Sequence, residues 1–175
     1  MVIAMCKEAP LEIERKYLIC YPNMAVLTKA EGYSKTEIEQ TYLKSDGSPF
    51  GGRVRKRGAN GKYTYTKTYK GSITAVKRVE IEEEITREEY DSLLKEADPM
   101  SQTVKKQRHC FLYEGLLFEL DIYPFWNDRA ILEVELKSED AQFAMPPFIE
   151  VVKEVTQDKR YRNRSIAKSV PCDNL

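Results

Sequence analysis

The sequence has little of what a zinc site or a disulfide framework requires. Its 175 residues include a single histidine, His109, and four cysteines without any C-x-x-C pair: Cys6, Cys20, Cys110 and Cys172. We therefore expect no zinc site. A chain of this length can build a core without disulfides, so we expect reduced cysteines and a cytoplasmic location. His109 and Cys110 are adjacent and would point to opposite faces of a strand, which excludes them as a catalytic pair.

Long apolar runs and net charge are also missing. No stretch approaches the about 20 apolar residues of a membrane helix, and residues 1–10 lack the basic start and apolar run of a secretory signal. The 28 basic residues balance the 28 acidic ones, which argues against nucleic acid held by overall charge. Hydrophobic residues make up 42%, so a disordered polyelectrolyte is excluded. We expect one domain, residues 1–175, as a monomer or homodimer.

The charges that are present are separated along the chain. Between Gly47 and Val79 there are nine basic residues and no acid, whereas Glu80 to Asp98 holds nine acids and two basic residues. A surface that needs only solubility mixes the two signs more evenly. The separation indicates a role beyond solubility.

Alternation with a period of two dominates the sequence and predicts a β-sheet. Turn signals such as Asn60-Gly61 and Glu114-Gly115 separate the alternating runs, and the first is typical of a tight hairpin. Eight strands with short connections favour an antiparallel meander or barrel. The predicted strands are Glu12–Ile19, Glu37–Leu43, Gly52–Arg57, Lys62–Tyr69, Lys77–Ile85, Thr103–Tyr113, Leu116–Tyr123 and Ala130–Lys137.

Few helices are expected. Thr86 and Glu89 form a capping box ahead of an apolar stripe that ends before Pro99, which predicts a helix there. Shorter helices are predicted after Asn23 and after Asp158, and another that Pro146-Pro147 opens. The fold class is therefore α+β, dominated by the sheet or barrel.

Ionic residues take alternate positions on these strands. One half-solvated strand would show the same pattern, so a single strand indicates only ordinary amphipathicity. Several strands together place like charges at i and i+2, about 7 Å apart, where they repel unless opposite charge lies between them. The alternative is a closed barrel of about eight strands with its charges inside. The pairs are Glu12/Glu14, Glu80/Glu82, Glu119/Asp121, Glu133/Glu135, Arg53/Arg55 and Lys106/Arg108.

Charges inside a barrel would favour phosphate chemistry. Enclosed carboxylates need a cation, and oxygen-only ligands suit Mg²⁺ or Mn²⁺. Arginine and lysine bind phosphate. A metal and cations around phosphates are the components of phosphoryl transfer.

The residues Glu12-Ile13-Glu14-Arg15-Lys16 resemble the ExExK signature of the CYTH superfamily, the triphosphate tunnel metalloenzymes. Further motifs follow in the family's order, and the segment 154–163 is most similar to bacterial inorganic triphosphatases. The resemblance spans residues 12–168. The motifs are Gln40-Thr41-Tyr42-Leu43, Arg53-x-Arg55, Tyr65-Thr66-Lys67, Arg78-x-Glu80-x-Glu82, Lys106-x-Arg108, Glu119-Leu120-Asp121 and Glu133-Val134-Glu135.

The resemblance implies an eight-stranded antiparallel tunnel, open at both ends and charged inside, with a few outer helices. It implies that Tyr42 contacts the reacting phosphate, that Glu80 and Glu82 orient cations or position water, and that Lys159 and Arg160 lie near a tunnel mouth. The implied metal ligands for Mg²⁺ or Mn²⁺ are Glu12, Glu14, Glu133 and Glu135, with Asp121 as a ligand or beside them. The implied phosphate-binding residues are Lys16, Arg53, Arg55, Lys67, Arg78, Lys106 and Arg108.

The implied activity is metal-dependent hydrolysis of inorganic triphosphate to pyrophosphate and phosphate, with side activity on nucleoside triphosphates. A class IV-type adenylyl cyclase and a thiamine triphosphatase are the enzymatic alternatives, and their products distinguish them. A non-enzymatic alternative is a polyphosphate or RNA 5′-end binding module that uses residues 47–79. Such a module would bind without metal and release no phosphate.

Overall fold

The computed structural model describes residues 13–45, 52–72, 78–138 and 140–174. Nine strands form one antiparallel sheet in the spatial order β5-β4-β3-β2-β6-β7-β8-β1-β9. All eight predicted strands are present, with ends that shift by a few residues. The strands are β1 (Ile13–Cys20), β2 (Ser34–Tyr42), β3 (Arg53–Ala59), β4 (Lys62–Ser72), β5 (Arg78–Ile85), β6 (Val104–Tyr113), β7 (Leu116–Ile122), β8 (Arg129–Leu136) and β9 (Val151–Glu154).

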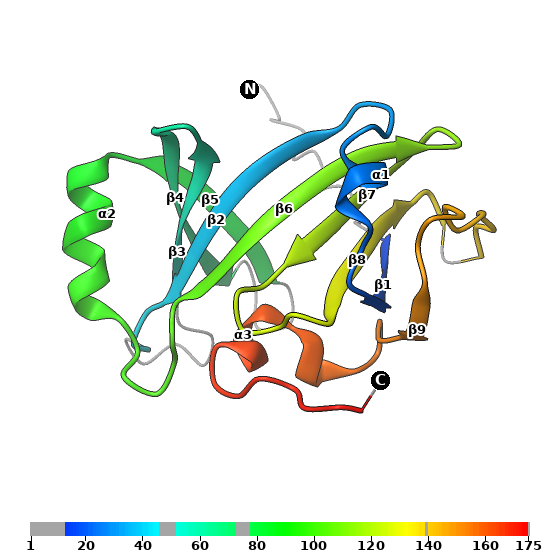
Figure 1. The fold of residues 1–175 in the computed structure, drawn as a ribbon. Helices are drawn as coiled ribbons and strands as arrows, with labels where there is room; N and C mark the ends of the chain where they lie inside the picture. Colours follow the sequence, from blue (N-terminus) through cyan, green and yellow to red (C-terminus); the bar gives the residue numbers. More distant parts are fainter. Residues whose placement is uncertain (1–12, 46–51, 73–77, 139, 175) are drawn as a thin grey trace, which may run out of the picture.

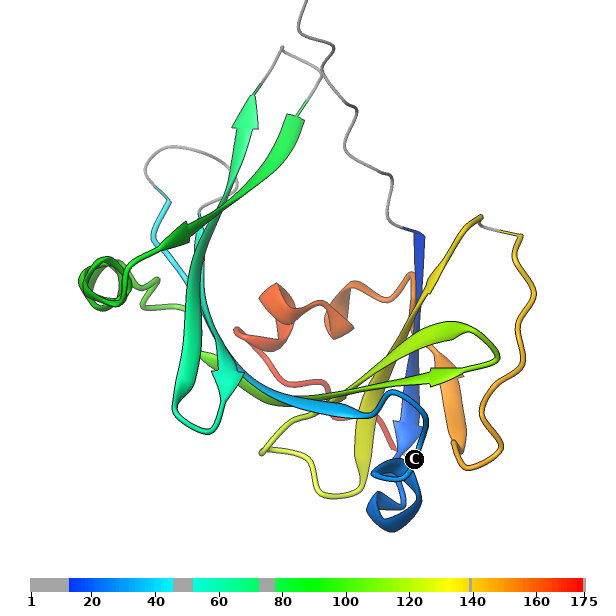
Figure 2. The same ribbon diagram turned by 90° about the horizontal axis from the view of Figure 1, so that it is seen from above.

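The sheet curves strongly, and we call its concave side the cup (Figures 1 and 2). Seen from above, β3 and β4 form one wall, β1 and β8 form the opposite wall, and β2, β6 and β7 join them (Figure 2). The predicted hairpin turns are confirmed. Asn60 and Gly61 have φ angles of 52° and 78°, and Glu114 and Gly115 have 47° and 76°. Two successive positive φ values match the twist of the flanking strands.

The antiparallel α+β class is confirmed, but the sheet does not close into a tunnel. Within the described residues β5 and β9 are its two edges. Strand β9 pairs with β1, with Tyr17 opposite Glu154 and Leu18 opposite Lys153. Strand β8 occupies one edge of β1 along its length, and β9 covers the other edge from Tyr17 to Ile19. Within the described residues no pairing joins β1 to β5, so the sheet stays open.

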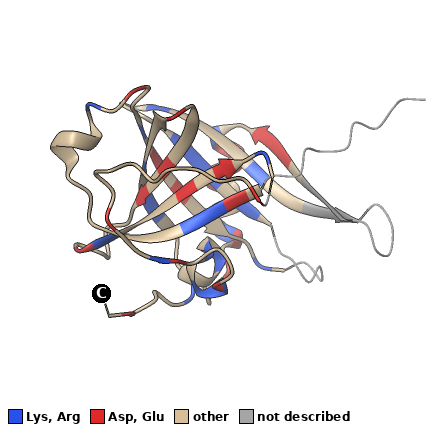
Figure 3. Cartoon of the chain, turned by 90° about the vertical axis from the view of Figure 1, so that its right-hand side faces the viewer, with Lys and Arg blue, Asp and Glu red and all other residues tan. Residues whose placement is uncertain are grey.

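In β8 the acids Glu133 and Glu135 lie on the face opposite to that of core residues such as Leu132. The pairing places Glu14 opposite Glu135 and Lys16 opposite Glu133, all on the face that lines the cup. Figure 3 shows the Lys and Arg segments and the Asp and Glu segments interrupted by other residues along the strands. The prediction of a charged interior is confirmed.

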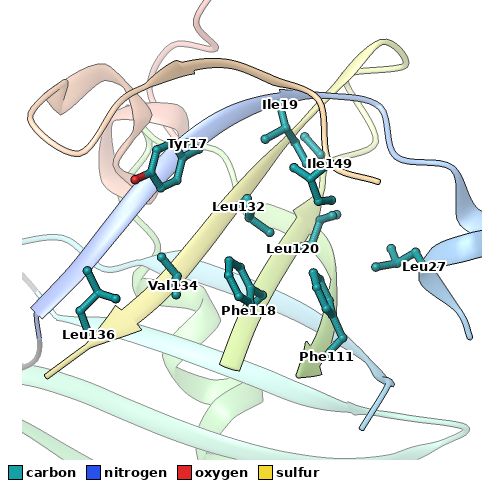
Figure 4. Close-up of a cluster of buried hydrophobic side chains, with 11 residues drawn as sticks. Tyr17, Ile19, Leu27, Phe111, Phe118, Leu120, Leu132, Val134, Leu136 and Ile149 are labelled. Carbon is teal, nitrogen blue, oxygen red and sulfur yellow. The ribbon is translucent and has the colours of Figure 1, made fainter. Parts of the chain in front are cut away.

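The main hydrophobic core lies outside the cup, on the convex face of β1, β6, β7 and β8 (Figure 4). Helix α1 (Met24–Leu27) and the segment 141–149 cover it. The rings of Phe111 and Phe118 stack with centroids 5.5 Å apart. Each buried side chain of this size contributes about 1.5–3 kcal/mol. The buried members are Tyr17, Ile19, Leu27, Phe111, Phe118, Leu120, Ala130, Leu132, Val134, Leu136 and Ile149.

Helix α2 (Arg87–Leu93) and the following 3₁₀ turn η1 (Leu94–Glu96) lie outside the wall that β3 and β4 form (Figure 2). The predicted capping box is confirmed, because the Glu89 backbone N–H donates to Thr86 Oγ1 at 3.1 Å and the Thr86 N–H donates to Glu89 Oε2 at 2.7 Å. Tyr90 packs on Tyr65 with ring centroids 5.0 Å apart. No helix in the described part of the chain has the length and apolarity to cross a membrane.

The C-terminal segment fills one end of the cup. It contains the 3₁₀ turn η2 (Lys159–Tyr161) and helix α3 (Asn163–Ile166), near the helix predicted after Asp158. Both lie at that end in Figures 1 and 2. Their apolar residues pack against residues on the concave face of the sheet. We call this buried cluster the floor: Leu18, Tyr42, Val104, Tyr123, Ile131, Val155, Tyr161, Ile166 and Ala167. The cup is therefore closed at one end, not open at both.

The prediction of a helix opened by Pro146-Pro147 is wrong. The chain remains irregular to Glu150 and then forms β9. The Arg15 guanidinium binds the Glu154 carboxylate through Nε at 3.1 Å and Nη2 at 2.5 Å. Pairing with the edge of β1 gives this segment partners for its backbone that its local sequence does not reveal.

Candidate active site

One side of the cup carries an acidic pocket of about 190 Å³. It is lined by Leu117 and Val134 and by four carboxylates, which define the acidic pocket: Glu14, Glu119, Glu133 and Glu135. Strand pairing brings them together, since Glu14 lies opposite Glu135 and Glu119 opposite Glu133. Like charges in such pairs destabilise a sheet unless cations lie between them.

Two cations hold these acids together. Lys16 Nζ lies 2.7 Å from Glu133 Oε1 and 3.7 Å from Glu14 Oε1. Arg108 Nη2 donates to Glu133 Oε2 at 2.8 Å, and its Nη1 binds Glu119. Arg108 thus bridges carboxylates of β7 and β8.

Asp121 lies beneath the pocket and is fully buried. Its oxygens accept hydrogen bonds from Arg108 Nε and Nη2, both at 2.7 Å, and from Lys106 Nζ at 2.5 Å. Burial alone would raise the pKa of Asp121, but Lys106 and Arg108 outweigh it and hold that pKa below its ordinary value. Asp121 is therefore the counter-ion of these two cations and is set back from the pocket, whereas the resemblance implies either a metal ligand or a residue beside the ligands.

The acidic pocket has the donor set of a hard-cation site. Burial, followed by the charge of Glu133, raises the pKa of Glu14, although Lys16 opposes the shift. A bound cation would relieve this, and carboxylate oxygens are the ligands that Mg²⁺ and Mn²⁺ favour. In the described ranges no three acids already converge as a metal shell, so a cation would have to draw them together.

The opposite side of the cup carries arginines of β3, which we call the basic wall: Arg53 and Arg55. Arg55 Nε and Nη2 each lie 3.4 Å from Gln40 Oε1, and Arg55 Nη1 lies 3.8 Å from Glu82 Oε2. Thr68 Oγ1 donates to that Glu82 oxygen at 3.0 Å. Burial, followed by the charge of Arg53, lowers the pKa of Arg55. A bound anion would reverse this shift, so the wall suits a phosphate.

Tyr42 connects the basic wall to the floor. Its side chain is buried, and its hydroxyl accepts a hydrogen bond from Gln40 Nε2 at 2.6 Å. Burial raises the pKa of Tyr42. The guanidinium carbon of Arg164 lies 5.3 Å from the centre of the ring. Gln40 thus links Tyr42 to Arg55, because its side chain forms hydrogen bonds with both residues.

Lys67 does not lie in the cup, contrary to its predicted phosphate contact. It pairs with Val54 and Glu83, which places it on the face opposite to that of Arg55. Its Nζ lies 5.6 Å from the Tyr69 ring centre. The concave positions of β4 are taken by threonines, with Thr66 opposite Arg55 and Thr68 opposite Arg53. A shift of one residue reverses the face, because side chains alternate along a strand.

The remaining predicted residues fall into two groups. Glu12 falls outside the described residues, and Arg78 and Glu80 are described only as backbone in β5. Lys159 and Arg160 lie in η2 at the closed end, where Arg160 pairs with Asp158 at 2.6 Å. The predicted residues that gather in the cup are Glu14, Lys16, Tyr42, Arg53, Arg55, Glu82, Lys106, Arg108, Asp121, Glu133 and Glu135.

The sequence interpretation gave no role to Glu119, Gln40 or Thr68. Glu119 shares a strand face with Asp121, and β7 and β8 follow one another, so its meeting with Glu133 could have been anticipated. Gln40 precedes Tyr42 by two residues on the same face. Thr68 has no such signal, because only the pairing of β3 with β4 reveals it. Among the described cysteines, Cys20, Cys110 and Cys172 are free.

The protein is thus a curved antiparallel sheet with an acidic pocket and a basic wall on its concave face. The CYTH domain family model matches residues 10–161, and the chain belongs to the CYTH family.

Named relatives support this assignment. The chain is 32% identical over 165 residues to the inorganic triphosphatase of Nitrosomonas europaea, covering 91% of this chain and 99% of that protein. It is 32% identical over 159 residues to the inorganic triphosphatase of Acetivibrio thermocellus, covering 90% and 94%. A crystal structure of an inorganic triphosphatase superposes with a TM-score of 0.62 at 29% identity, covering 95% of this chain and all of that one.

Proposed function

We propose that this protein hydrolyses inorganic triphosphate to pyrophosphate and phosphate with a divalent cation, Mg²⁺ or Mn²⁺. The observation that carries the proposal is the arrangement of charge in the cup, with the four carboxylates of the acidic pocket on one side and the two arginines of the basic wall on the other. Burial, followed by a like-charged neighbour, raises the pKa of Glu14 and lowers that of Arg55. A cation bound to a triphosphate would supply a counter-charge to both sides. The relatives named as inorganic triphosphatases support the same activity.

The carboxylates of the acidic pocket, Glu14, Glu119, Glu133 and Glu135, would hold the cation. When bound, it would neutralise phosphate oxygens and the charge that develops as the phosphoanhydride breaks. Lys16 and Arg108 already neutralise part of this acidic charge. Lys16 can also contact phosphate oxygens, whereas Nε, Nη1 and Nη2 of Arg108 are all engaged by carboxylates.

The basic wall would bind the remaining phosphates. Arg53 and Arg55 present guanidinium groups, which match phosphate oxygens better than an ammonium does. Glu82 and Gln40 orient Arg55, and Thr66 and Thr68 lie opposite the two arginines on β4. This arrangement would hold the triphosphate in one orientation. Such positioning is the main source of catalysis in phosphoryl transfer.

The reaction forms one bond and breaks one. A water oxygen bonds to a terminal phosphorus, the bridging P–O bond breaks, and its electron pair leaves with pyrophosphate. The products are pyrophosphate, orthophosphate and one proton. Nucleoside triphosphates contain the same phosphoanhydride bond, so they would react as a side activity.

The test is a product panel with inorganic triphosphate, ATP, thiamine triphosphate and pyrophosphate, each with Mg²⁺ or Mn²⁺. We expect orthophosphate and pyrophosphate from inorganic triphosphate, and loss of turnover in Glu14→Gln. Glu31→Gln, which alters an exposed loop acid, is the matched control. Cyclic AMP from ATP, preference for thiamine triphosphate, or metal-independent binding without phosphate release would each replace this proposal with the corresponding alternative.

We propose further that residues 1–175 form one domain and that the protein is cytoplasmic. All nine described strands belong to one sheet, which supports a single domain. The free thiols of Cys20, Cys110 and Cys172 are in keeping with a reducing compartment.

A further inference from the structure

Asp173, close to the C-terminus, gathers donors from three separate elements. Its Oδ2 accepts from Lys153 Nζ of β9 and from the Tyr161 hydroxyl of η2, both at 2.5 Å. Its Oδ1 accepts from Arg160 Nη1 at 2.7 Å. Its backbone carbonyl accepts from Arg129 Nη1 of β8 at 2.5 Å. We call these contacts the Asp173 clasp.

The clasp holds both ends of the segment that makes the floor. Between Tyr161 and Asp173 lie the residues that touch the site from below. Asn163 Oδ1 accepts from the Tyr123 hydroxyl at 3.0 Å, and Arg164 lies over the Tyr42 ring. The Tyr123 ring centre is 5.8 Å from Lys106 Nζ.

Tyr42 carries the position of the floor into the basic wall. Its hydroxyl fixes Gln40, and Gln40 Oε1 faces Arg55. A movement of the C-terminal segment would therefore change the contacts of Arg55 even when no residue in the cup is substituted.

We infer that Asp173 is a positioning residue that fastens the C-terminal segment as the floor of the cup and, through Tyr42 and Gln40, sets Arg55 for phosphate binding. This role rests on the proposed function. Asp173 is 19% exposed, so water screens the clasp only in part. Hydrogen bonds from Lys153, Tyr161 and Arg160 lower the pKa of Asp173, which keeps it ionised at neutral pH.

The only tryptophan in the chain reports on the clasp without any substrate. The Trp126 ring lies 6.3 Å from that of Tyr161 and 6.0 Å from the Arg129 guanidinium carbon. Loosening the segment removes these neighbours, so the emission of Trp126 and its quenching by acrylamide must change.

The experiment compares Asp173→Asn with Asp91→Asn. Asp91 is an exposed acid of α2 that pairs with Arg87 at 3.7 Å, on an element that contributes no member of the clasp. We expect Asp173→Asn to increase acrylamide quenching of Trp126 and to raise KM for inorganic triphosphate about fivefold, with kcat within about twofold. Asp91→Asn should leave both near wild type. Asp173→Glu, which keeps the charge, should restore most of the affinity.

Lys153→Met removes one donor of the clasp and should shift quenching and KM in the same direction by less. It serves as the test if Asp173→Asn does not fold. Unchanged Trp126 quenching, or a lower melting temperature with KM unchanged, in these variants would overturn the inference. If the wild type does not hydrolyse triphosphate, the proposed function fails, whereas the quenching comparison still decides whether the clasp exists.

Discussion

Charge compensation determines what each ionic residue in the cup can do. Lys106, Arg108 and Asp121 satisfy one another in buried contacts of 2.5–2.7 Å. Removing one member would leave a buried charge without its partner, typically at a cost of about 3–5 kcal/mol. Burial and a like-charged neighbour instead raise the pKa of Glu14 and lower that of Arg55, which a bound counter-ion would reverse. We therefore assign folding to the first group and ligand binding to the second.

Arg55→Ala should weaken triphosphate binding strongly. A charge-assisted phosphate contact is worth about 1.5–3 kcal/mol, so kcat/KM should fall about 10- to 150-fold. Lys67→Ala is the control, because Lys67 lies on the convex face of the same sheet. Phosphate-release kinetics measure both variants. An equal loss in Lys67→Ala would contradict the assignment of faces.

His109 should make the fold sensitive to mild acid. It is 1% exposed, its Nδ1 lies 2.9 Å from the Tyr33 hydroxyl, and its buried Nε2 has no hydrogen-bond partner within the described structure. Burial, followed by the charge of Lys35, lowers the pKa of His109. The unfolded chain therefore binds the proton more tightly, and stability present above about pH 6.5 is lost as the pH falls.

Urea denaturation at pH 7.5 and pH 5 measures this effect. The group contributes at most about 1.4 kcal/mol for each pH unit below its unfolded pKa. His109→Gln should reduce the drop in unfolding free energy relative to wild type. An identical pH dependence in the two proteins would remove His109 as the cause.

Among the elements, the β3–β4 hairpin leaves no room for a side chain at one of its glycines. Gly58 lies where an added Cβ would come within 2.0 Å of the Lys62 carbonyl oxygen and 2.8 Å of the Tyr63 Cα. Both are backbone atoms that can move only by disturbing the hairpin. The same β3 carries Arg53 and Arg55, so the hairpin also supports the basic wall.

Gly58→Ala should destabilise the protein by more than about 1 kcal/mol, because the clash is with backbone. Lys62→Ala, which shortens an exposed side chain on the same hairpin, should stay within about 0.5 kcal/mol of wild type. Thermal or urea unfolding gives both values. A stability of Gly58→Ala close to that of Lys62→Ala would show that the hairpin absorbs a side chain there.

Local patterns predicted the strands and their turns but not every partner. Period-two alternation located β1 to β8, and Asn60-Gly61 located a hairpin, because both signals depend on neighbouring residues. The face of Lys67 depends on how β4 pairs with β3, which no local pattern records. Likewise, the apolar residues after Pro147 fit a helix or a strand, and only the distant edge of β1 decides for β9.

For the candidate site, too, local patterns predicted part of the arrangement and distant contacts decided the rest. Alternate charges showed which residues share a face, and the family motifs showed which faces form a site. The sequence could not show that Asp121 is already neutralised by two cations, since that depends on side chains from two strands meeting in a dry interior. It also could not show that the C-terminal segment closes one end of the cup.

Across the whole molecule, the strands that carry the acidic pocket (β1, β7 and β8) and the strand that carries the basic wall (β3) lie on opposite sides of the cup (Figure 2). Without phosphate they should bind their ligands independently. We therefore expect Glu14→Gln to weaken Mn²⁺ binding more than about tenfold, equivalent to about 1.4 kcal/mol, and Arg55→Ala to change it less than about twofold. Electron paramagnetic resonance of free Mn²⁺ measures both. Equal weakening by the two substitutions would place the cation between the walls.

The open sheet leaves β5 at one edge within the described residues, where a bare strand could join that of another molecule. Glu82, Glu83 and Glu84 are all exposed there. Joining two such edges would crowd carboxylates of the same sign, which discourages the first step of fibrous assembly at neutral pH. Because salt screens exposed charges, high ionic strength would weaken that protection.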